Sequence, residues 1–189
     1  MNLRTEEFQR LMTDTVRVAL IYGSTRTGRL CDKVAGWAAK QIARTGNFAI
    51  ETIDPAATPM NEIREGLAAS DAIVVVTPEY NHGYPAPLKQ LIDSFNTEWH
   101  AKPVAFVSYG GMSGGIRAVE QLRQVFVELH AMTVRDGVTF PNAWQQFETE
   151  TPQDSARAER SMAVMLERLH WWAIALRIAR TATPYTIAA

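Results

Sequence analysis

The sequence of 189 residues lacks several features that mark particular protein classes. It has one cysteine, so it can form no internal disulfide, and a reducing compartment is expected. Its formal net charge of −1 argues against non-specific binding to nucleic acid or to an anionic membrane. No apolar run approaches the roughly 18 residues that a membrane span needs. The first fifteen residues are charged and contain no apolar signal-peptide core. We therefore expect a cytoplasmic protein with neither nucleic-acid nor membrane partners.

Two common phosphate-binding motifs are also missing from the sequence. Neither the Walker pattern GxxxxGK[ST] nor the dinucleotide pattern GxGxxG occurs. We also expect no metal site. Any phosphate site in this chain must therefore be built in another way.

The sequence does contain a regular alternation of strand-like and helix-like segments. Strands are predicted over 16–22, 48–53, 71–77, 103–108 and 132–135, and helices over about 30–45, 60–70, 86–95, 116–130 and 155–180. The alternation indicates one parallel sheet with helices on both faces. Five strands favour a flavodoxin-like three-layer sandwich with the sheet order 2-1-3-4-5.

Further predictions concern the two ends of the chain and the segment before its last helix. Residues 1–15 could form a short helix or a loosely attached arm, and residues 16–189 fit one domain. Residues 136–152 are expected to be irregular. The closing helix has an inward apolar stripe that includes Trp172, and a second apolar flank of Trp171, Ile174 and Ile178. That flank fits either a partner chain or burial within this chain.

In the predicted fold, the loops after the first, third and fourth strands meet at one crevice. The first is GSTRTGR, in which Ser24 offers a hydroxyl and Arg26 and Arg29 offer cationic groups. The helix that follows directs its first backbone amides to the same place, which favours a bound phosphate. The alternative is a capped helix start with solvated arginines.

The other two loops suit a planar ligand. In PEYNHGY, Tyr80 and Tyr84 can offer ring faces or edges, and Asn81 can hydrogen-bond the edge of a heterocycle. In SYGGMSGG, Gly110 and Gly111 allow the backbone to approach a ring closely, since no Cβ stands in the way. The alternatives are a rigid proline-bracketed turn with surface tyrosines and a glycine turn before a helix.

A phosphate site beside a planar-ring site describes a mononucleotide of the FMN type. The segments GSTRTGR, TPEYNHGYPAPLKQLID and KPVAFVSYGGMSGG resemble the signature loops of the NADPH-dependent FMN reductase family, which is flavodoxin-like. The resemblance extends over roughly residues 16–180. FPNAW and ERLHWWAIALRIAR resemble one bacterial branch of that family.

The resemblance implies bound FMN, NADPH or NADH as the hydride donor, and a homodimer or homotetramer. It assigns the FMN site to Ser24, Arg26, Arg29, Pro78, Glu79, Tyr80, Asn81, His82, Ser108, Tyr109, Gly110 and Gly111. No strict catalytic side chain is implied, and for the titratable Glu79 and His82 a structural or intersubunit ion pair is favoured. The chain departs from many relatives at Arg29 and Cys31, where serine and asparagine are common. Cys31 is expected to be a buried packing residue.

The expected activity is an NAD(P)H-dependent oxidoreductase that reduces its bound flavin and then a quinone, an azo dye, a metal oxyanion or free flavin. The alternatives are a flavodoxin-like electron carrier and an FMN-binding redox sensor. Carriers usually have a strongly acidic docking surface, whereas this chain is near neutral.

Overall fold

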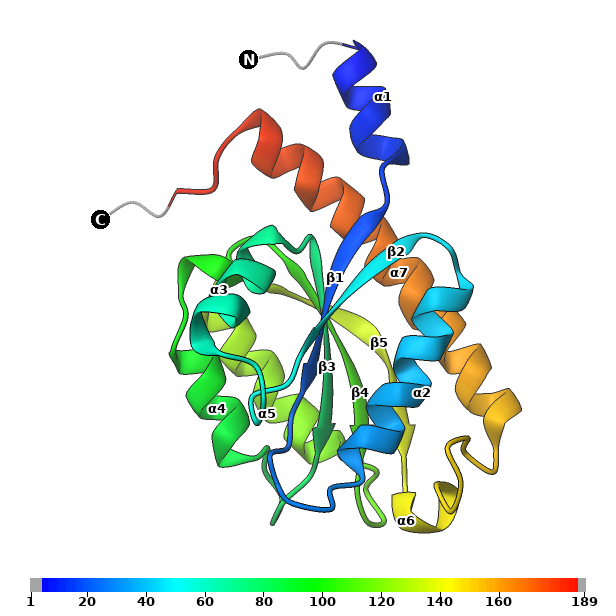
Figure 1. Ribbon diagram of the computed structural model, residues 1–189. Coiled ribbons are helices and arrows are strands. Elements are labelled where there is room, and N and C mark those ends of the chain that lie inside the picture. Colours follow the sequence, from blue (N-terminus) through cyan, green and yellow to red (C-terminus); the bar gives the residue numbers. More distant parts are fainter. Residues whose placement is uncertain (1–4, 187–189) are drawn as a thin grey trace.

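The computed structural model describes residues 5–186 and consists of one parallel sheet between two layers of helices (Figure 1). The sheet order β2-β1-β3-β4-β5 confirms the predicted flavodoxin-like fold. The strands are β1 (Val16–Tyr22), β2 (Phe48–Ile53), β3 (Ala72–Pro78), β4 (Pro103–Tyr109) and β5 (Met132–Phe140). Every residue of β3 and β4 is buried, because helices cover both faces of these central strands.

The two helical layers form two separate apolar clusters, one on each face of the sheet. One face is covered by α2 (Cys31–Arg44) and α7 (Ser155–Ala182), and the other by α3 (Met60–Ala69), α4 (Ala86–Asp93) and α5 (Ile116–Glu128) (Figure 1). A short 3-10 helix, η1 (Thr97–Trp99), follows α4. Its Trp99 is fully buried and donates its indole N–H to the carbonyls of Ile92 and Phe95.

The N-terminal stretch contains α1 (Thr5–Thr13), which contacts α7. The helical alternative therefore holds for residues 5–13, whereas residues 1–4 lie outside the described part of the chain. The proposed division between an N-terminal arm and a domain beginning at residue 16 stays a prediction. Between residues 5 and 186, no helix combines the length and the apolarity needed to cross a membrane.

The predicted end of the fifth strand was wrong. The strand was expected to stop at Arg135, but β5 continues to Phe140. Thr133 pairs with Val104 and Gly137 pairs with Phe106, so four residues of β5 advance beside two residues of β4. The polar residues Arg135 and Asp136, which suggested the end of the strand, lie in this bulge, and the strand continues beyond them. The continuation carries the chain into the short helix α6 (Ala143–Gln146), inside the segment that was expected to be irregular.

The closing helix also differs from its predicted burial pattern. Trp172 was assigned to the inward stripe, but it is 37% exposed, although the next residue, Ala173, is fully buried. Trp172 therefore lies at the edge of the buried face of α7. Its ring instead packs edge-on against Trp171, with 4.9 Å between the ring centroids. Ile174 of the second flank is buried within this chain, and Ile178 packs against the same core.

We expect Gly115→Ala to destabilise the fold strongly. Gly115 precedes α5 with φ +89°, and a Cβ there would lie 2.8 Å from Cβ of Ser108 and 2.9 Å from the backbone nitrogen of Tyr109. The left-handed backbone and the overlap together should lower the free energy of unfolding by about 2–4 kcal/mol in urea denaturation.

Gly36→Ala in the middle of α2 is the matched control. Gly36 has no heavy atom within 4 Å of an added Cβ, so alanine there should raise the free energy of unfolding by roughly 0.5–1 kcal/mol. If both variants unfolded at the same urea concentration, the loop before α5 would not be constrained as we describe.

Candidate functional site

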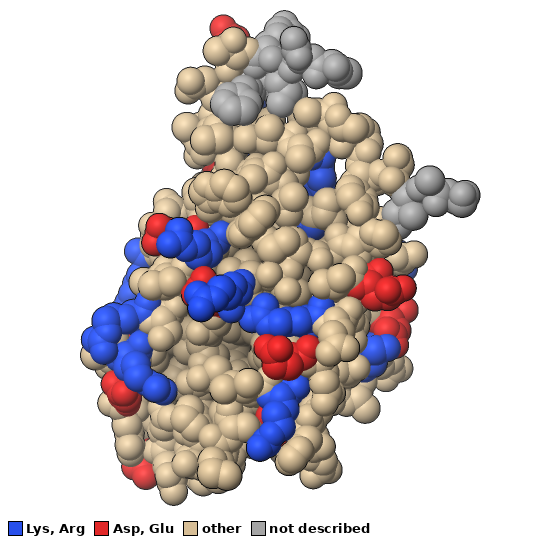
Figure 2. Space-filling model, turned by 180° about the vertical axis from the view of Figure 1, so that it is seen from behind, with Lys and Arg blue, Asp and Glu red and all other residues tan. Residues whose placement is uncertain are grey.

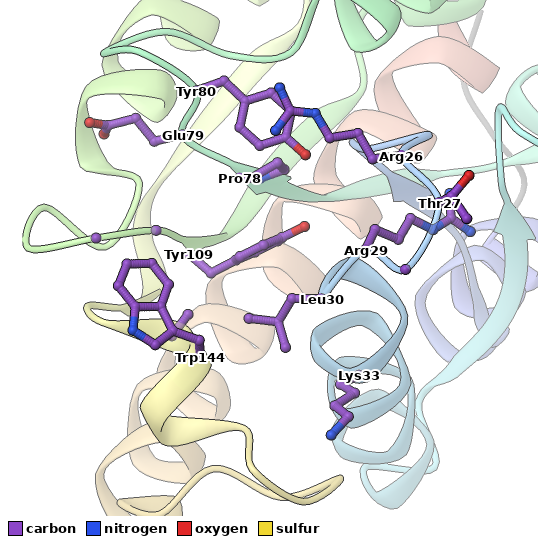
Figure 3. A pocket seen from close by; sticks show the side chains of 14 residues that line it. Arg26, Thr27, Arg29, Leu30, Lys33, Pro78, Glu79, Tyr80, Tyr109 and Trp144 are labelled. Atoms are coloured by element: carbon purple, nitrogen blue, oxygen red, sulfur yellow. The ribbon is translucent and has the colours of Figure 1, made fainter.

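The loops after β1, β3 and β4 meet at the carboxyl edge of the sheet and border a cavity of about 610 Å³. Parallel pairing brings them together, because Tyr22 pairs with Val76 and Pro78 pairs with Tyr109 at the ends of the strands. The segment around α6 completes the cavity (Figure 3). Its volume lies within the range of small-molecule and cofactor sites.

The floor of the cavity is formed by Pro78, Tyr109 and Leu30 (Figure 3). Tyr109 is 5% exposed, and its hydroxyl is placed to interact with the thiol of Cys31. Burial raises the pKa of Tyr109 and also that of Cys31, so both groups stay neutral. Cys31 is fully buried, which confirms its expected packing role. The floor is thus an uncharged and largely apolar surface.

One wall is an arginine stacked on an aromatic ring. Cζ of Arg26 lies 3.6 Å from the centroid of the Tyr80 ring, and Figure 3 shows the two groups together above the floor. The Tyr80 hydroxyl is 2.7 Å from Oγ of the buried Ser24. Ser24 therefore supports the wall from behind and does not itself line the cavity.

The tight turn that follows Tyr80 leads away from the cavity. Tyr80 and Gly83 exchange two backbone hydrogen bonds, while Asn81 and His82 have φ values of 50° and 69°. Two successive positive φ values are typical of a type I′ hairpin turn, which favours asparagine at its first central position. The side chains of Asn81 and His82 are exposed and do not border the cavity.

Glu79 lines the cavity but its carboxylate is bound by α5. The Arg117 guanidinium donates to Oε1 at 2.7 Å, and the Arg117 backbone N–H donates to Oε2 at 3.1 Å. Burial raises the pKa of the Glu79 carboxyl, but the hydrogen bonds from Arg117 and Ser113 outweigh it and leave the pKa lowered. The structural ion pair favoured for Glu79 is therefore present within one chain.

Ser108 does not border the cavity either. Successive residues of a strand point to opposite faces of the sheet, so Ser108 points away from the side occupied by Tyr109. Its hydroxyl donates to the Gly114 carbonyl at 2.8 Å and thereby holds the glycine loop in place. Gly110 and Gly111, further along that loop, do line the cavity.

Arg29 lines the cavity, but three groups already bind its guanidinium. It forms a two-pronged pair with Asp54, with Nη1 at 2.8 Å from Oδ1 and Nη2 at 2.5 Å from Oδ2. Nε donates to Asp32 at 2.7 Å, and Nη1 also donates to the Ser24 carbonyl. These hydrogen bonds, that of Asp54 first, raise the pKa of Arg29 and keep it charged. Its side chain is only 10% exposed, so Arg29 holds the loop after β1 in place from the protein interior.

The other two basic side chains that line the cavity, Lys33 and Arg26, differ in their hydrogen-bond partners. Lys33 donates to the carbonyls of Phe147 and Glu148, at 3.2 and 3.1 Å. Arg26 is exposed and, among residues 5–186, makes no ion pair with a carboxylate. An anion in the cavity would find an exposed guanidinium at Arg26, and the amides of the first turn of α2, which follows this loop, also favour negative charge.

Sequence reasoning missed the wall opposite Arg26. Its main member is Trp144 of α6, with Ala143 beside it; Lys33 borders the same side of the cavity (Figure 3). The available signal was the aromatic in FPNAW, which follows the fifth strand and so had to lie near the same edge of the sheet. The strand was ended too early for that inference to be drawn. The described residues contain no cluster of three or more metal-ligating side chains.

The chain is similar in sequence to known oxidoreductases. A family model described as NADPH-dependent FMN reductase matches residues 16–145. An NAD(P)H-dependent FMN reductase of Schizosaccharomyces pombe is 33% identical over 156 residues, which cover 70% of this chain and 78% of that protein. A quinone reductase of Pseudomonas putida is 33% identical over 141 residues, 64% of this chain and 76% of that protein.

Among solved structures, the flavoenzyme NAD(P)H:(acceptor) oxidoreductase FerB of Paracoccus denitrificans has the same fold. Its TM-score is 0.63 at 21% identity, and the match covers 84% of this chain and 97% of that chain.

Removing the ion pair between Arg29 and Asp54 should destabilise the protein, and the size of the effect should depend on pH. Asp54→Asn keeps an oxygen for the backbone N–H of Ala56 but removes the charge that holds Arg29. We expect the free energy of unfolding at pH 7 to fall by about 1.5–3 kcal/mol, the range for hydrogen bonds to charged groups. Urea denaturation between pH 7 and pH 3 measures this.

The sign of the pH effect follows from the lowered pKa of Asp54, which its hydrogen bond from Arg29 causes. The stabilisation is complete above the ordinary pKa of 3.8 and is lost as the pH falls through the lower folded-state value. The variant and the wild type should therefore converge in acid. Asp93→Asn, which breaks the exposed pair with Lys89, is the control and should change stability little. A gap that stays constant down to pH 3 would mean that the charge of Asp54 is not what stabilises the loop.

Proposed function

The chain belongs to the NADPH-dependent FMN reductase family, and from this we propose that it binds FMN in the cavity of Figure 3 and reduces quinones with NAD(P)H. The observation that carries the proposal is the composition of the cavity. It combines an uncharged, largely apolar floor with an exposed arginine in the loop that leads into α2. These are the two chemistries that a ring system bearing a single phosphate requires.

The residues present fit this cofactor. Pro78, Tyr109 and Leu30 would lie against the ring system, and Gly110 and Gly111 would let the backbone approach it. Arg26 and the backbone amides at the start of α2 would bind the phosphate. Arg29 was expected to bind the phosphate directly. Because Arg29 donates its hydrogen bonds to Asp54 and Asp32, we assign it a structural role instead: it holds in place the loop that contacts the phosphate.

When bound, FMN supplies the redox chemistry, carrying two electrons from NAD(P)H to a quinone that also takes up two protons and becomes a hydroquinone. The task of the protein is to hold the planar groups against one another and to exclude water from between them. Glu79 is held by Arg117, so its carboxylate is committed to fixing α5 and the loop after β3. We assign no catalytic residue.

The electron-carrier alternative is less well supported. Figure 2 shows one face of the molecule on which basic side chains lie beside acidic ones, without a continuous acidic surface. The net charge of −1 agrees with this. Quinones are favoured as acceptors because similar proteins include a quinone reductase. Azo dyes, metal oxyanions and free flavin stay predictions, as do the cytoplasmic location and the homodimer or homotetramer.

Anaerobic spectroscopy tests the proposed function. The purified protein, loaded with FMN, should lose its visible flavin absorbance on addition of NADPH or NADH and regain it on addition of 1,4-naphthoquinone. A carrier or a sensor would bind the flavin but would not be reduced by the nicotinamide on this time scale. A protein that ignores FMN and retains FAD after purification would contradict the proposal at its first step.

We expect Arg26→Ala to weaken FMN binding by about tenfold to a hundredfold, because a charge-assisted hydrogen bond contributes roughly 1.5–3 kcal/mol. Fluorescence titration with FMN measures this, and riboflavin, which lacks the phosphate, provides the internal control. Affinity for riboflavin should be nearly unchanged. Arg168→Ala on the exposed surface of α7 is the matched variant and should alter neither affinity. An equal loss for both ligands would show that Arg26 acts through its stacking on Tyr80 and not through the phosphate.

A further inference from the structure

Trp144 is an exposed aromatic side chain at the opening of the cavity. Its side chain is 59% exposed, whereas Tyr109 on the floor is 5% exposed. Trp144 is thus a large apolar ring placed where a ligand that enters from solvent first meets the protein. Isolated exposed tryptophans are not unusual, but this one borders the cavity formed by the loops after β1, β3 and β4.

The position of Trp144 is fixed by backbone hydrogen bonds at the start of α6 and by a side-chain hydrogen bond from its last residue. The N–H groups of Asn142 and Ala143 donate to the carbonyls of Gly111 and Gly110, at 2.8 and 3.0 Å. The Gln146 side chain donates to the Pro141 carbonyl at 2.7 Å, which closes the segment on itself. The backbone therefore stays attached to the glycine loop whatever side chain residue 144 carries.

The ring is aimed at the ligand space by the same arrangement. A Cβ built on Gly111 would lie 3.7 Å from Cη2 of Trp144, so the indole extends beside the glycine loop toward the opening. Figure 3 shows Trp144 on the opposite side of the floor from the stacked Arg26 and Tyr80. The cavity is consequently a slot with an arginine-bearing wall on one side and an aromatic wall on the other.

We propose that Trp144 is a specificity-determining residue whose indole stacks on the planar ring of the electron acceptor. This inference rests on the proposed function. The difference in exposure between Tyr109 and Trp144 indicates which ligand each of them contacts. The buried floor suits a cofactor that stays bound, whereas an exposed ring at the opening suits a substrate that enters and leaves. The indole prefers planar aromatic acceptors, since offset-stacked and edge-to-face contacts between aromatic rings add to the area they bury. A compact inorganic oxidant gains nothing from it.

Equilibrium binding of 1,4-naphthoquinone to the oxidised, FMN-loaded protein tests this inference without turnover. No NAD(P)H is present, so the quinone stays oxidised and its dissociation constant can be measured by calorimetry. Trp144→Ala should raise that constant about three- to tenfold, the effect of one aromatic pair, and Trp144→Phe should restore most of the affinity. The FMN dissociation constant should be unchanged in both variants.

Trp171→Ala is the matched control, because Trp171 is 61% exposed but lies on α7. It should leave naphthoquinone binding at the wild-type value. In steady-state assays, Trp144→Ala should raise the KM for naphthoquinone by the same factor and leave the KM for ferricyanide, which is not planar, unchanged.

Three outcomes would overturn the inference. Weaker FMN binding in Trp144→Ala would make the tryptophan a cofactor contact. Equal effects of Trp144→Ala and Trp171→Ala would remove its special role, and so would equal changes in the KM values for naphthoquinone and ferricyanide. Failure of the proposed function is distinguishable, because a wild-type protein that is not reduced by NAD(P)H would fail before any variant is compared.

Discussion

Parallel pairing of β3 with both β1 and β4 is the constraint on which the rest of this structure depends. It brings Tyr22, Val76, Pro78 and Tyr109 to one edge of the sheet, so that three loops distant in sequence share one space. A slip of β3 or β4 by one residue would exchange the side chains that pack against the two helical layers, so the close packing on both faces holds the register. The cavity is rigid for the same reason, since Pro78 and Tyr109 of its floor are the last paired residues of β3 and β4.

Charge is distributed around the cavity so that one arginine is committed and another is available. Arg29 is bound by Asp54 and Asp32 and serves to shape the loop, whereas Arg26 reaches the cavity with only the Tyr80 ring beneath it. Desolvating a charge is costly unless it is paired, which explains why the less exposed of the two arginines has the carboxylates. The ion pair between Arg29 and Asp54 fixes the loop that carries Arg26, so the Arg26 guanidinium is held beside the cavity.

Most of the fold could be predicted from the sequence, because the period of the apolar residues and the alternation of elements are local signals. The elements that failed were set by tertiary contacts. The bulge near Arg135 depends on β4, and the exposure of Trp172 depends on how α7 packs against β4 and β5. For the site, the sequence indicated which loops meet but not which of their side chains point into the cavity. Ser108 was assigned to the cavity although strand alternation turns it away, and Arg29 could not be separated from Arg26 without knowing that Asp54 lies beneath it.

The attachment of α6 to the glycine loop has a consequence for how such proteins can diverge. Residue 144 is fixed through the backbone of its neighbours, and its own side chain contributes nothing to that attachment. Substitutions there can therefore accumulate with little loss of stability. Such a position is open to selection for new chemistry while the cofactor chamber beneath it stays intact. Libraries that vary this single codon are accordingly a compact route to altered substrate range on an unchanged scaffold.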